Sequence, residues 1–264
     1  MGTALVTGAS SGIGKELARL FAADGHGVVL VARRLALLEE LAGELRARHG
    51  VNATAIACDL AAPGGVDGLV AELGARGLHV DFLVNNAGFG TTGRFVDSPA
   101  ERELAMTELN VTAVVRLTHA LLPAMLARGQ GRILNIGSTA GFQPGAYMAA
   151  YYASKAFVNH FSEGLAYELR GSGVTVTVSC PGPTQTEFGS VSGVDQSALF
   201  KLSVAPAAKV AREAYRALFA GRVMVIHGLL NRLGVQLLRI GPRAVVRALV
   251  ASLNRPPVAA GTQS

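Results

Sequence analysis

The sequence predicts an α/β protein with one doubly wound, mostly parallel seven-stranded sheet and a helical extension at its C-terminal end. Two observations carry this prediction. Short runs rich in Val, Ile and Leu alternate with longer segments of helical periodicity, and Gly, Asp, Asn or Pro bound each run. The runs are almost continuously apolar, which is typical of parallel strands that helices cover on both faces. A length of 264 residues, half of them hydrophobic, suits one large domain.

The individual elements follow from these patterns. Strands are expected at residues 3–7, 27–32, 51–57, 80–85, 131–137, 173–179 and 222–227. Helices are expected between them, near residues 12–24, 35–48, 64–76, 100–127, 149–170 and 206–219. No apolar stretch is long enough and free enough of charge to predict a membrane span. Because the strands and helices alternate throughout, residues 1–227 are expected to form a single domain.

The segment 228–255 differs from the rest of the chain because it is both Leu-rich and basic. From Arg222 to Arg255 there are six Arg and no Asp or Glu, a charge equal to the net +6 of the whole chain. Gly241-Pro242 should divide the segment into two short amphipathic helices, and residues 256–264 are expected to be disordered. Since the excess charge is local and has no interleaved aromatic residues, the sequence does not indicate a nucleic-acid-binding protein.

A glycine-rich turn, Thr7-Gly8-Ala9-Ser10-Ser11-Gly12-Ile13-Gly14, separates the first expected strand from the first expected helix. Glycine at such a turn lets the backbone approach a phosphate, and the helix N-terminus presents free N–H groups and a partial positive charge. The turn therefore indicates a pyrophosphate site. An ordinary tight turn between strand and helix is the alternative, because the chain contains 32 Gly.

The end of the second strand carries arginines instead of a carboxylate: Ala32 runs directly into Arg33-Arg34. In a dinucleotide-binding unit, a carboxylate here would bind the ribose hydroxyls of NAD, whereas arginine accepts the 2′-phosphate of NADP. The pattern therefore favours NADP(H) over NAD(H), with two solvated arginines as the alternative. Asp59, at the end of the third strand, either accepts a hydrogen bond from the adenine amino group or stabilises a turn.

Tyr151 and Lys155 lie one turn apart in an expected helix. A phenol has an ordinary pKa of about 10, and a neighbouring ammonium favours the phenolate, which brings the group closer to the range useful for acid–base catalysis. Ser138 follows the fifth strand, at the sheet edge where α/β proteins bind ligands, and its hydroxyl can donate to a developing alkoxide. Asn110, inside an expected helix, either holds a water that passes protons on from Lys155 or is a satisfied core residue.

Taken together, these motifs resemble those of the short-chain dehydrogenases/reductases. The residues that match, in the order and rough spacing of that family, are Thr7-Gly8-x-x-x-Gly12-x-Gly14, Asn85-Asn86-Ala87-Gly88, Asn110, Ser138, Tyr151-x-x-x-Lys155 and Pro181-Gly182-x-x-x-Thr186. The resemblance covers residues 1 to about 227. It implies a Rossmann-type single domain that transfers a hydride between a nicotinamide and a carbonyl or alcohol, without a metal.

The resemblance also implies roles for individual residues. Tyr151 would be the acid/base, Lys155 would lower its pKa and hold the nicotinamide ribose, Ser138 would orient the carbonyl, and Asn110 would anchor a proton-relay water. Tyr152 is not expected to be the acid, because only Tyr151 has Lys four residues later. The cofactor-binding residues expected on these grounds are Gly8, Ser10, Ser11, Gly12, Ile13, Gly14, Arg33, Asp59, Leu60, Asn86, Ala87, Gly88, Tyr151, Lys155, Pro181, Gly182, Thr184 and Thr186.

Substrate specificity is expected after Ser138 and in the loop 187–204. No Arg or Lys precedes Lys201 in that loop, and the residues singled out are mostly apolar, so a hydrophobic ketone, aldehyde or alcohol is predicted. These residues are Phe142, Gln143, Pro144, Tyr147, Phe188, Val191, Val194, Leu199 and Phe200.

Two questions stay open from the sequence alone. A non-catalytic NADP-binding regulator or redox sensor is the alternative function, although the Tyr–Lys pair argues against it. We expect a cytoplasmic protein, since Cys58 and Cys180 do not form a disulfide pattern. The resemblance implies a homo-oligomer, a dimer or tetramer. The segment 228–255 either lies on anionic lipid or packs over the cleft or against another subunit. The resemblance favours packing, because members of the family usually assemble and cover the site with C-terminal segments.

Overall fold

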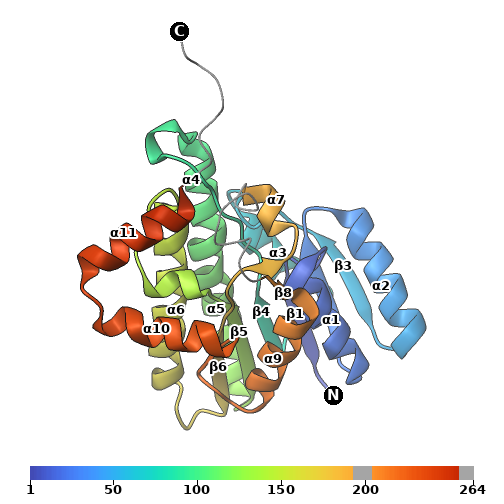
Figure 1. Cartoon of the computed structure of the whole chain (residues 1–264). Coiled ribbons are helices and arrows are strands. Elements are labelled where there is room, and N and C mark those ends of the chain that lie inside the picture. Colours follow the sequence, from blue (N-terminus) through green and yellow to red (C-terminus); the bar gives the residue numbers. More distant parts are fainter. Residues whose placement is uncertain (193–203, 256–264) are drawn as a thin grey trace.

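The computed structural model describes residues 1–192 and 204–255 and confirms the predicted fold class (Figure 1). Seven parallel strands form one sheet in the order β3-β2-β1-β4-β5-β6-β9. The sheet begins at β1 in its middle, extends to β3 on one side, and returns to β4 next to β1. This reversal of direction creates a crevice at the carboxyl ends of β1 and β4, which is where open α/β sheets bind ligands.

The strands lie where the apolar runs predict them, with ends that differ by one or two residues in five of the seven strands. Residues 51–52, 80–81 and 222–223 precede the strands instead of joining them. The observed strands are β1 Thr3–Thr7, β2 Gly27–Ala32, β3 Ala53–Ala57, β4 Phe82–Asn85, β5 Gly131–Ile136, β6 Val174–Cys180 and β9 Met224–Ile226. A second sheet of two short parallel strands, β7 Thr184–Gln185 and β8 Ala205–Pro206, is not predicted by the sequence.

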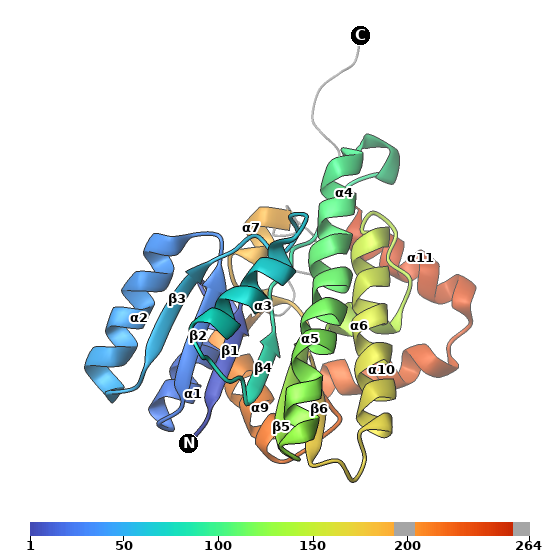
Figure 2. The same ribbon diagram turned by 180° about the vertical axis from the view of Figure 1, so that it is seen from behind.

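Helices cover both faces of the large sheet, as Figures 1 and 2 show from opposite sides. Alternate residues of each strand point to opposite faces, so Ala4 and Val6 of β1 pack on one side and Leu5 on the other. The helices are α1 Gly12–Ala23, α2 Leu35–His49, α3 Gly65–Ala75, α4 Ala100–Thr107, α5 Ala113–Ala127, α6 Ala149–Glu168, α7 Phe188–Ser192, α9 Ala207–Phe219, α10 Leu229–Ile240 and α11 Arg243–Asn254.

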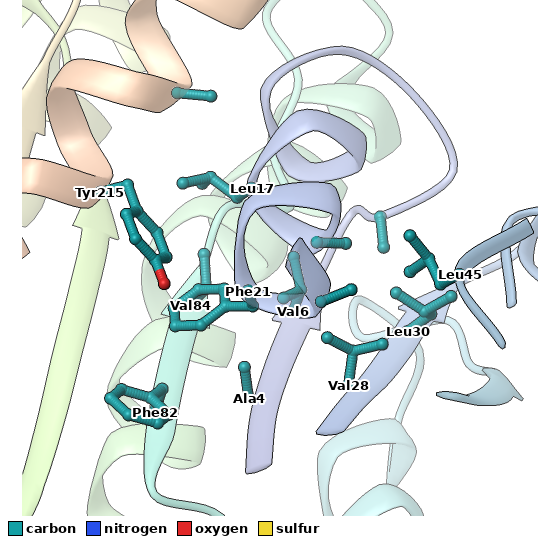
Figure 3. Packing of buried hydrophobic residues seen from close by; sticks show 14 of the residues in the cluster. Ala4, Val6, Leu17, Phe21, Val28, Leu30, Leu45, Phe82, Val84 and Tyr215 are labelled. Atoms are coloured by element: carbon teal, nitrogen blue, oxygen red, sulfur yellow. The ribbon is translucent and has the colours of Figure 1, made fainter. Parts of the chain in front are cut away.

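The two halves of the core contain different helices. On one face Leu17 and Phe21 of α1 meet Tyr215 of α9 above the central strands, and the Phe21 and Tyr215 rings lie edge to face 4.9 Å apart (Figure 3). On the other face α3, α5 and α6 cover the sheet through residues such as Leu69 and Leu117. Burial on both faces explains why the strands are continuously apolar.

The region predicted as one helix, 100–127, is continuous but not uniform. A π-helical segment, Glu108–Thr112, joins α4 to α5, and Asn110 lies within it. Such local π segments are rare and cluster at functional sites. By length and composition alone Ala100–Ala127 could cross a membrane, contrary to the expectation from the sequence. In the fold Ala113, Leu117 and Met125 of this helix belong to the core beneath the sheet.

The C-terminal extension forms two helices, α10 and α11, which separate at Gly241-Pro242 as predicted. Both lie at one edge of the molecule beside α6, opposite the edge formed by α2 and β3 (Figures 1 and 2). Val194, Leu199, Phe200 and Lys201, and the tail 256–264, lie outside the described residues.

Candidate active site

A cleft of about 400 Å³ runs along the carboxyl edge of the sheet, at the crevice between β1 and β4. It brings together nearly all predicted site residues, although they come from segments up to 178 residues apart, Gly8 and Thr186 being the outermost (186 − 8 = 178). Of the predicted catalytic and cofactor-binding residues, Gly14 and Asn110 are the two that do not line the cleft in the described structure. Gly14 leaves no room for a side chain beside the Asn86 amide, and Asn110 is bonded to Phe89; both Asn86 and Phe89 line the cleft.

The glycine-rich turn is shaped by close contacts that only glycine permits. Gly12 has φ +56°, and a Cβ atom there would lie 2.8 Å from Cγ2 of Thr186. Gly8 has φ +65°, and its Cβ would lie 2.9 Å from Cα of Ala87. Positive φ and the lack of a side chain let the first turn approach both loops. The turn is therefore more than an ordinary tight connection, because two other cleft loops depend on its shape.

Asn86 and Thr7 hold this turn in place from below. The Asn86 amide donates to the carbonyl oxygens of Thr7, at 2.9 Å, and Gly8, at 3.2 Å. The Thr7 hydroxyl oxygen accepts hydrogen bonds from the backbone N–H groups of Asn86 and Ala87, both at 3.0 Å. The ends of β1 and β4 are thereby fixed to one another at the bottom of the crevice.

Two arginines follow β2, and they differ in their partners. Arg34 donates to the Glu187 carboxylate at 2.6 and 3.3 Å and to the Ser10 hydroxyl at 3.0 Å. This ion pair lowers the pKa of Glu187, with the Arg34 hydrogen bond as the largest cause. Arg33 also lines the cleft and makes no ion pair with any residue in the described ranges. Of the two guanidinium groups, Arg33 is therefore the one that the described residues leave without a carboxylate partner.

Asp59, predicted to contact the adenine, and Leu60, predicted to bind the cofactor, both line the cleft beyond β3. The Asp59 carboxylate accepts a hydrogen bond from the Ala61 N–H at 3.0 Å, so it stabilises the turn that starts there. The turn role weighed in the sequence is thus present, and the side chain still borders the cleft.

Tyr151 lies at the opposite end of the cleft, on the first turn of α6. Burial raises the pKa of Tyr151, and a side-chain hydrogen bond with Ser138 lowers it in part. Ser138 is itself held in place: its hydroxyl donates to the Pro181 carbonyl at 3.3 Å and accepts from the Ala140 N–H at 3.1 Å. The pair presents two hydroxyl groups to the same part of the cleft. Without a bound ligand, the phenol form of Tyr151 is strongly favoured.

Lys155, one turn further along α6, is buried as an isolated ammonium. Its Nζ donates to the carbonyl of Ile136, the last residue of β5, at 2.8 Å. Burial lowers the pKa of Lys155 to about 8, because no carboxylate in the described structure pairs with it. Nζ lies 6.0 Å from the centroid of the Tyr151 ring. Burial is thus the largest cause of the pKa shifts of both Tyr151 and Lys155, and it favours the neutral form of each side chain.

Asn110 makes three hydrogen bonds with its side chain, all inside the protein. Its Oδ1 accepts from the Phe89 N–H at 3.1 Å, and its Nδ2 donates to the Phe89 carbonyl at 2.9 Å and to the Ser154 hydroxyl at 3.1 Å. Ser154 in turn donates to the carbonyl of Tyr151 at 2.7 Å. The satisfied core role weighed in the sequence is therefore present: Asn110 fixes the loop after β4 to the helix that carries Tyr151. Its part in proton relay stays a prediction.

The loop after β6 closes the cleft. The Thr139 N–H donates to the Pro181 carbonyl at 2.9 Å, and the Thr184 hydroxyl donates to the Gly182 carbonyl at 2.9 Å. Thr186 accepts a hydrogen bond from the Phe188 N–H at 3.2 Å and thereby starts α7. All four predicted residues of this loop, Pro181, Gly182, Thr184 and Thr186, line the cleft.

The substrate end of the cleft differs from the prediction. Phe188 lines it, with its ring 5.2 Å from that of Tyr151. Phe142, Gln143, Pro144 and Tyr147 are not among its lining residues in the described structure, because the chain turns away after Ala140 and returns only at Met148. The apolar residues that replace them are Phe89, Leu109, Met148 and Tyr152.

Tyr152 also connects the site to the C-terminal extension. Its hydroxyl exchanges hydrogen bonds with the Asn254 side chain, at 3.2 Å to Oδ1 and 3.1 Å to Nδ2, and Nδ2 also donates to the Ala146 carbonyl at 3.2 Å. Val246 and Val250 of α11 belong to the same apolar cluster as Tyr151. No local sequence pattern links positions 102 residues apart, so this contact could not be found from the sequence.

A second cluster of catalytic residue types lies outside the cleft and is structural. Ser179 is 2.8 Å from His227 Nε2, and His227 Nδ1 is 2.8 Å from the Glu213 carboxylate. Ser179 is fully buried on β6, so no substrate reaches its hydroxyl. The group ties β6 and β9 to α9. Among residues 1–192 and 204–255, no group of three or more His, Cys, Asp or Glu side chains is arranged to hold a metal ion.

The cleft fits a nicotinamide dinucleotide on grounds of its own. The N-terminus of α1 points into it with no side-chain cap and no acidic residue in the first turn, so its N–H groups suit phosphate oxygens. Cβ atoms at Gly8 and Gly12 would fill the space beside that turn. Arg33 supplies an exposed cation at one end, and Lys155 and Tyr151 supply polar hydrogens at the other.

Comparison with known proteins establishes the family. The family model for short-chain dehydrogenases matches residues 2–196, so the chain belongs to that family and is an oxidoreductase. It is 40% identical to a sulfoacetaldehyde reductase of Chromohalobacter salexigens, over 87% of this chain and 91% of that protein.

Solved structures agree with this assignment. A short-chain dehydrogenase from Sphingobium yanoikuyae in complex with NADPH is 35% identical, with a TM-score of 0.81 over 92% of this chain and 98% of that one. A 7β-hydroxysteroid dehydrogenase is 28% identical, with a TM-score of 0.85 over 95% of this chain and 97% of that one.

Proposed function

We propose that this short-chain dehydrogenase uses NADP(H) to transfer a hydride between nicotinamide and a hydrophobic carbonyl or alcohol. The observation that carries the proposal is a single cleft with exposed Arg33 and Arg34 at one end and the Tyr151–Ser138 pair beside apolar side chains at the other. The two ends match the two chemical parts of such a reaction, a phosphorylated ribose and a polarised carbonyl.

Support for NADP(H) comes from the end of β2. Ala32 closes the strand and the next residue, Arg33, borders the cleft, so the strand itself ends without a carboxylate, and the Glu187 carboxylate nearby is bonded to Arg34. A guanidinium binds a phosphate through two parallel hydrogen bonds. The related dehydrogenase from Sphingobium yanoikuyae binds NADPH.

The proton chemistry follows from burial. The bound dinucleotide supplies or accepts the hydride. In the direction of reduction, the phenol of Tyr151 donates its proton to the carbonyl oxygen, and the high pKa that burial gives it keeps that proton available at neutral pH. Ser138 donates a hydrogen bond to the same oxygen as negative charge develops on it. Lys155, with a pKa of about 8, is mostly protonated at pH 7 and stabilises the resulting phenolate.

Support for a hydrophobic substrate comes from the side chains near Tyr151. Phe89, Leu109, Met148 and Phe188 contribute apolar surface there. The described lining has no cation at this end apart from Lys155, so it offers no clasp for a sulfonate or carboxylate. A small anionic aldehyde, as in the sulfoacetaldehyde reductase, is the second candidate because that relative is 40% identical.

The test is NADPH oxidation with a panel of bulky ketones and aldehydes, with sulfoacetaldehyde in a separate assay. Tyr151→Phe should lower turnover by about 10²–10⁴-fold while NADPH binding is retained. Tyr167→Phe is the matched control, since that ring is exposed on α6 away from the cleft.

Three outcomes would contradict the proposal. Turnover of sulfoacetaldehyde alone would replace the substrate class. Equal use of NADH would remove the cofactor preference. Tight NADPH binding without turnover of any compound would favour the alternative of a non-catalytic NADP-binding regulator.

A further inference from the structure

The two C-terminal helices have an inward and an outward face. On the inward face Val235, Val246 and Val250 are buried, and Asn254 is bonded to Tyr152. Leu238 of α10 and Val246 and Val250 of α11 pack into the cluster that contains Tyr151. Both helices are therefore anchored to the body of the protein. The sequence leaves open whether this segment packs on the fold or lies on lipid. The inward face explains the packing, and it leaves the outward face to be explained.

The outward face is apolar and exposed. Seven of its large apolar side chains, all between Leu229 and Leu249, are 53–82% exposed. Four of those on α10 follow helical spacing along one side, so they form a continuous stripe. The seven residues are Leu229, Leu230, Leu233, Leu237, Ile240, Val245 and Leu249. Exposed apolar side chains gathered in this way indicate an interaction surface.

Charge distinguishes between the partners that such a face could bind. Arg232, Arg243 and Arg247 are exposed on these helices and Arg255 is exposed directly after α11; none of the four pairs with a carboxylate within the described residues. From Arg222 to Arg255 the sequence has no Asp or Glu. A symmetric dimer through this face would bring arginines of one protomer toward those of the other, which is unfavourable. An anionic surface, in contrast, satisfies both the apolar stripe and the arginines.

We propose that the outward face of α10 and α11 docks on an anionic lipid bilayer, with the Leu stripe inserted at the interface and the arginines among the headgroups. The physical basis is that of interfacial amphipathic helices, which combine apolar burial with attraction to acidic lipids. Unlike a free amphipathic tail, these helices are already ordered against the body, so docking requires no folding step. The two helices would then contact the body of the protein on their inward side and the bilayer on their outward side.

The location of this surface has a consequence for substrate access, which rests on the proposed function. Asn254 of α11 is bonded to Tyr152, the neighbour of Tyr151 in α6. Docking through α10 and α11 therefore places the bilayer next to the wall of the apolar end of the cleft, because Val246 and Val250 of α11 pack into the cluster that contains Tyr151. A lipophilic carbonyl compound dissolved in the membrane would then reach the site without crossing bulk water.

The test is vesicle flotation of the full chain, with phosphatidylcholine vesicles alone and with added phosphatidylserine. We expect the protein to float with the anionic vesicles at low salt, less at moderate salt, and not with the neutral vesicles. Leu230→Ser and Ile240→Ser, at the two most exposed positions of the stripe, should each weaken partitioning about tenfold. Arg243→Gln and Arg247→Gln should each weaken it about fivefold at low salt.

The control variant is Leu35→Ser, an exposed leucine on α2 at the opposite edge of the molecule (Figure 1). Its flotation should equal that of the wild type, and NADPH binding by every variant reports that the fold is intact. Absence of flotation with anionic vesicles at both salt concentrations would overturn the proposal. So would equal binding to neutral vesicles, or flotation that Leu230→Ser and Ile240→Ser leave unchanged.

A second copy of the chain is the remaining occupant, and light scattering detects it. A dimer that dissociates in Leu230→Ser, together with no lipid binding, would assign the face to self-association and overturn the proposal. These outcomes are independent of turnover, so failure of lipid binding and failure of the proposed reaction are distinguishable.

Discussion

Arg34 and Glu187 form an ion pair across the cleft, with 2.6 Å between Nη2 and Oε2, although they are 153 residues apart in the chain. Arg34 follows β2 and also donates to Ser10 in the glycine-rich turn, while Glu187 precedes Phe188 at the start of α7. The Glu187 carboxylate is thus bonded to a guanidinium at the end of the cleft that would receive a 2′-phosphate. Glu187 is also the chain neighbour of Phe188, which lines the substrate end of the cleft.

The first prediction is that Glu187→Gln strengthens the binding of NADPH. Removing the carboxylate frees Arg34 for the 2′-phosphate, and because both side chains are about half exposed we expect a modest change, a two- to fivefold lower Kd. The Kd for NADH should stay the same, since NADH lacks that phosphate. The fluorescence of NADPH measures the first Kd and that of NADH the second, and the chain has no Trp to interfere.

The matched control for this prediction is Glu72→Gln, which removes a comparable exposed pair with Arg76 on α3. It should change neither Kd. Weaker NADPH binding by Glu187→Gln would show that the carboxylate helps to hold the dinucleotide instead of competing with it.

The second prediction concerns Lys155 and pH. Burial lowers its pKa from 10.5 to about 8, so between these two values the unfolded chain binds the proton and the folded chain does not. The free energy of unfolding is therefore lowered below pH 8, and it increases again as the pH rises from 8 to 10.5. Lys155→Met should be more stable than the wild type at pH 7, by about 1–3 kcal/mol after loss of the bond to Ile136, and this advantage should shrink toward pH 10.

Urea unfolding at pH 7 and at pH 10 measures this difference. Lys209→Met, at an exposed position on α9, is the control and should show no pH-dependent change relative to the wild type. A gap between Lys155→Met and wild type that stays constant with pH would mean that the ammonium is hydrated in solution.

The third prediction is that Asn254→Ala impairs substrate binding and leaves cofactor binding unchanged. The change removes the bonds to Tyr152 and Ala146 and leaves a buried phenol without its partner, which costs about 1–3 kcal/mol. We expect a lower Tm, by roughly 2–4 °C for each kcal/mol, and a raised KM for the carbonyl substrate. Ser252→Ala, at an exposed position of the same helix, should change neither quantity.

The fourth prediction separates two effects of glycine at the first turn. Gly12→Ala puts a side chain at φ +56° and 2.8 Å from Thr186, whereas Gly50→Ala puts one at φ +66° with nothing within 4 Å. Both should lower stability by about 1–2 kcal/mol through backbone strain. Only Gly12→Ala should weaken NADPH binding, and adding Thr186→Ser should restore part of it, because Cγ2 is the atom in the way. Equal NADPH affinities of the two alanine variants would contradict this assignment.

The fold was predictable because its signals are local. The seven strands of the large sheet are apolar runs with breakers at their ends, and Gly241-Pro242 breaks the C-terminal helices where a helix cannot continue. The π-helical segment around Asn110 was not predictable, since its residues are compatible with an α-helix and the tertiary bonds to Phe89 and Ser154 accompany the change. The two-stranded sheet of β7 and β8 is likewise too short to leave a pattern.

The site shows the same division. The glycine turn and the Tyr151–Lys155 spacing are visible in the sequence because each involves neighbours on one element. Arg34–Glu187 and Tyr152–Asn254 are not, because each joins distant elements through polar side chains that solvent could equally satisfy. Phe142 and Tyr147 do not line the described cleft for a related reason: position in the chain after Ser138 does not determine which way the loop turns.

The bond between Tyr152 and Asn254 also implies an order of events during synthesis. A nascent chain folds from its N-terminal end as it leaves the ribosome. The last strand of the sheet, β9, is made before α11, so the nucleotide half of the cleft can form while the wall beside Tyr152 does not yet exist. A newly made molecule is therefore able to acquire its dinucleotide before it can enclose a substrate. Ribosome-stalled chains with β9 outside the exit tunnel and α11 still inside it would be the place to observe that interval.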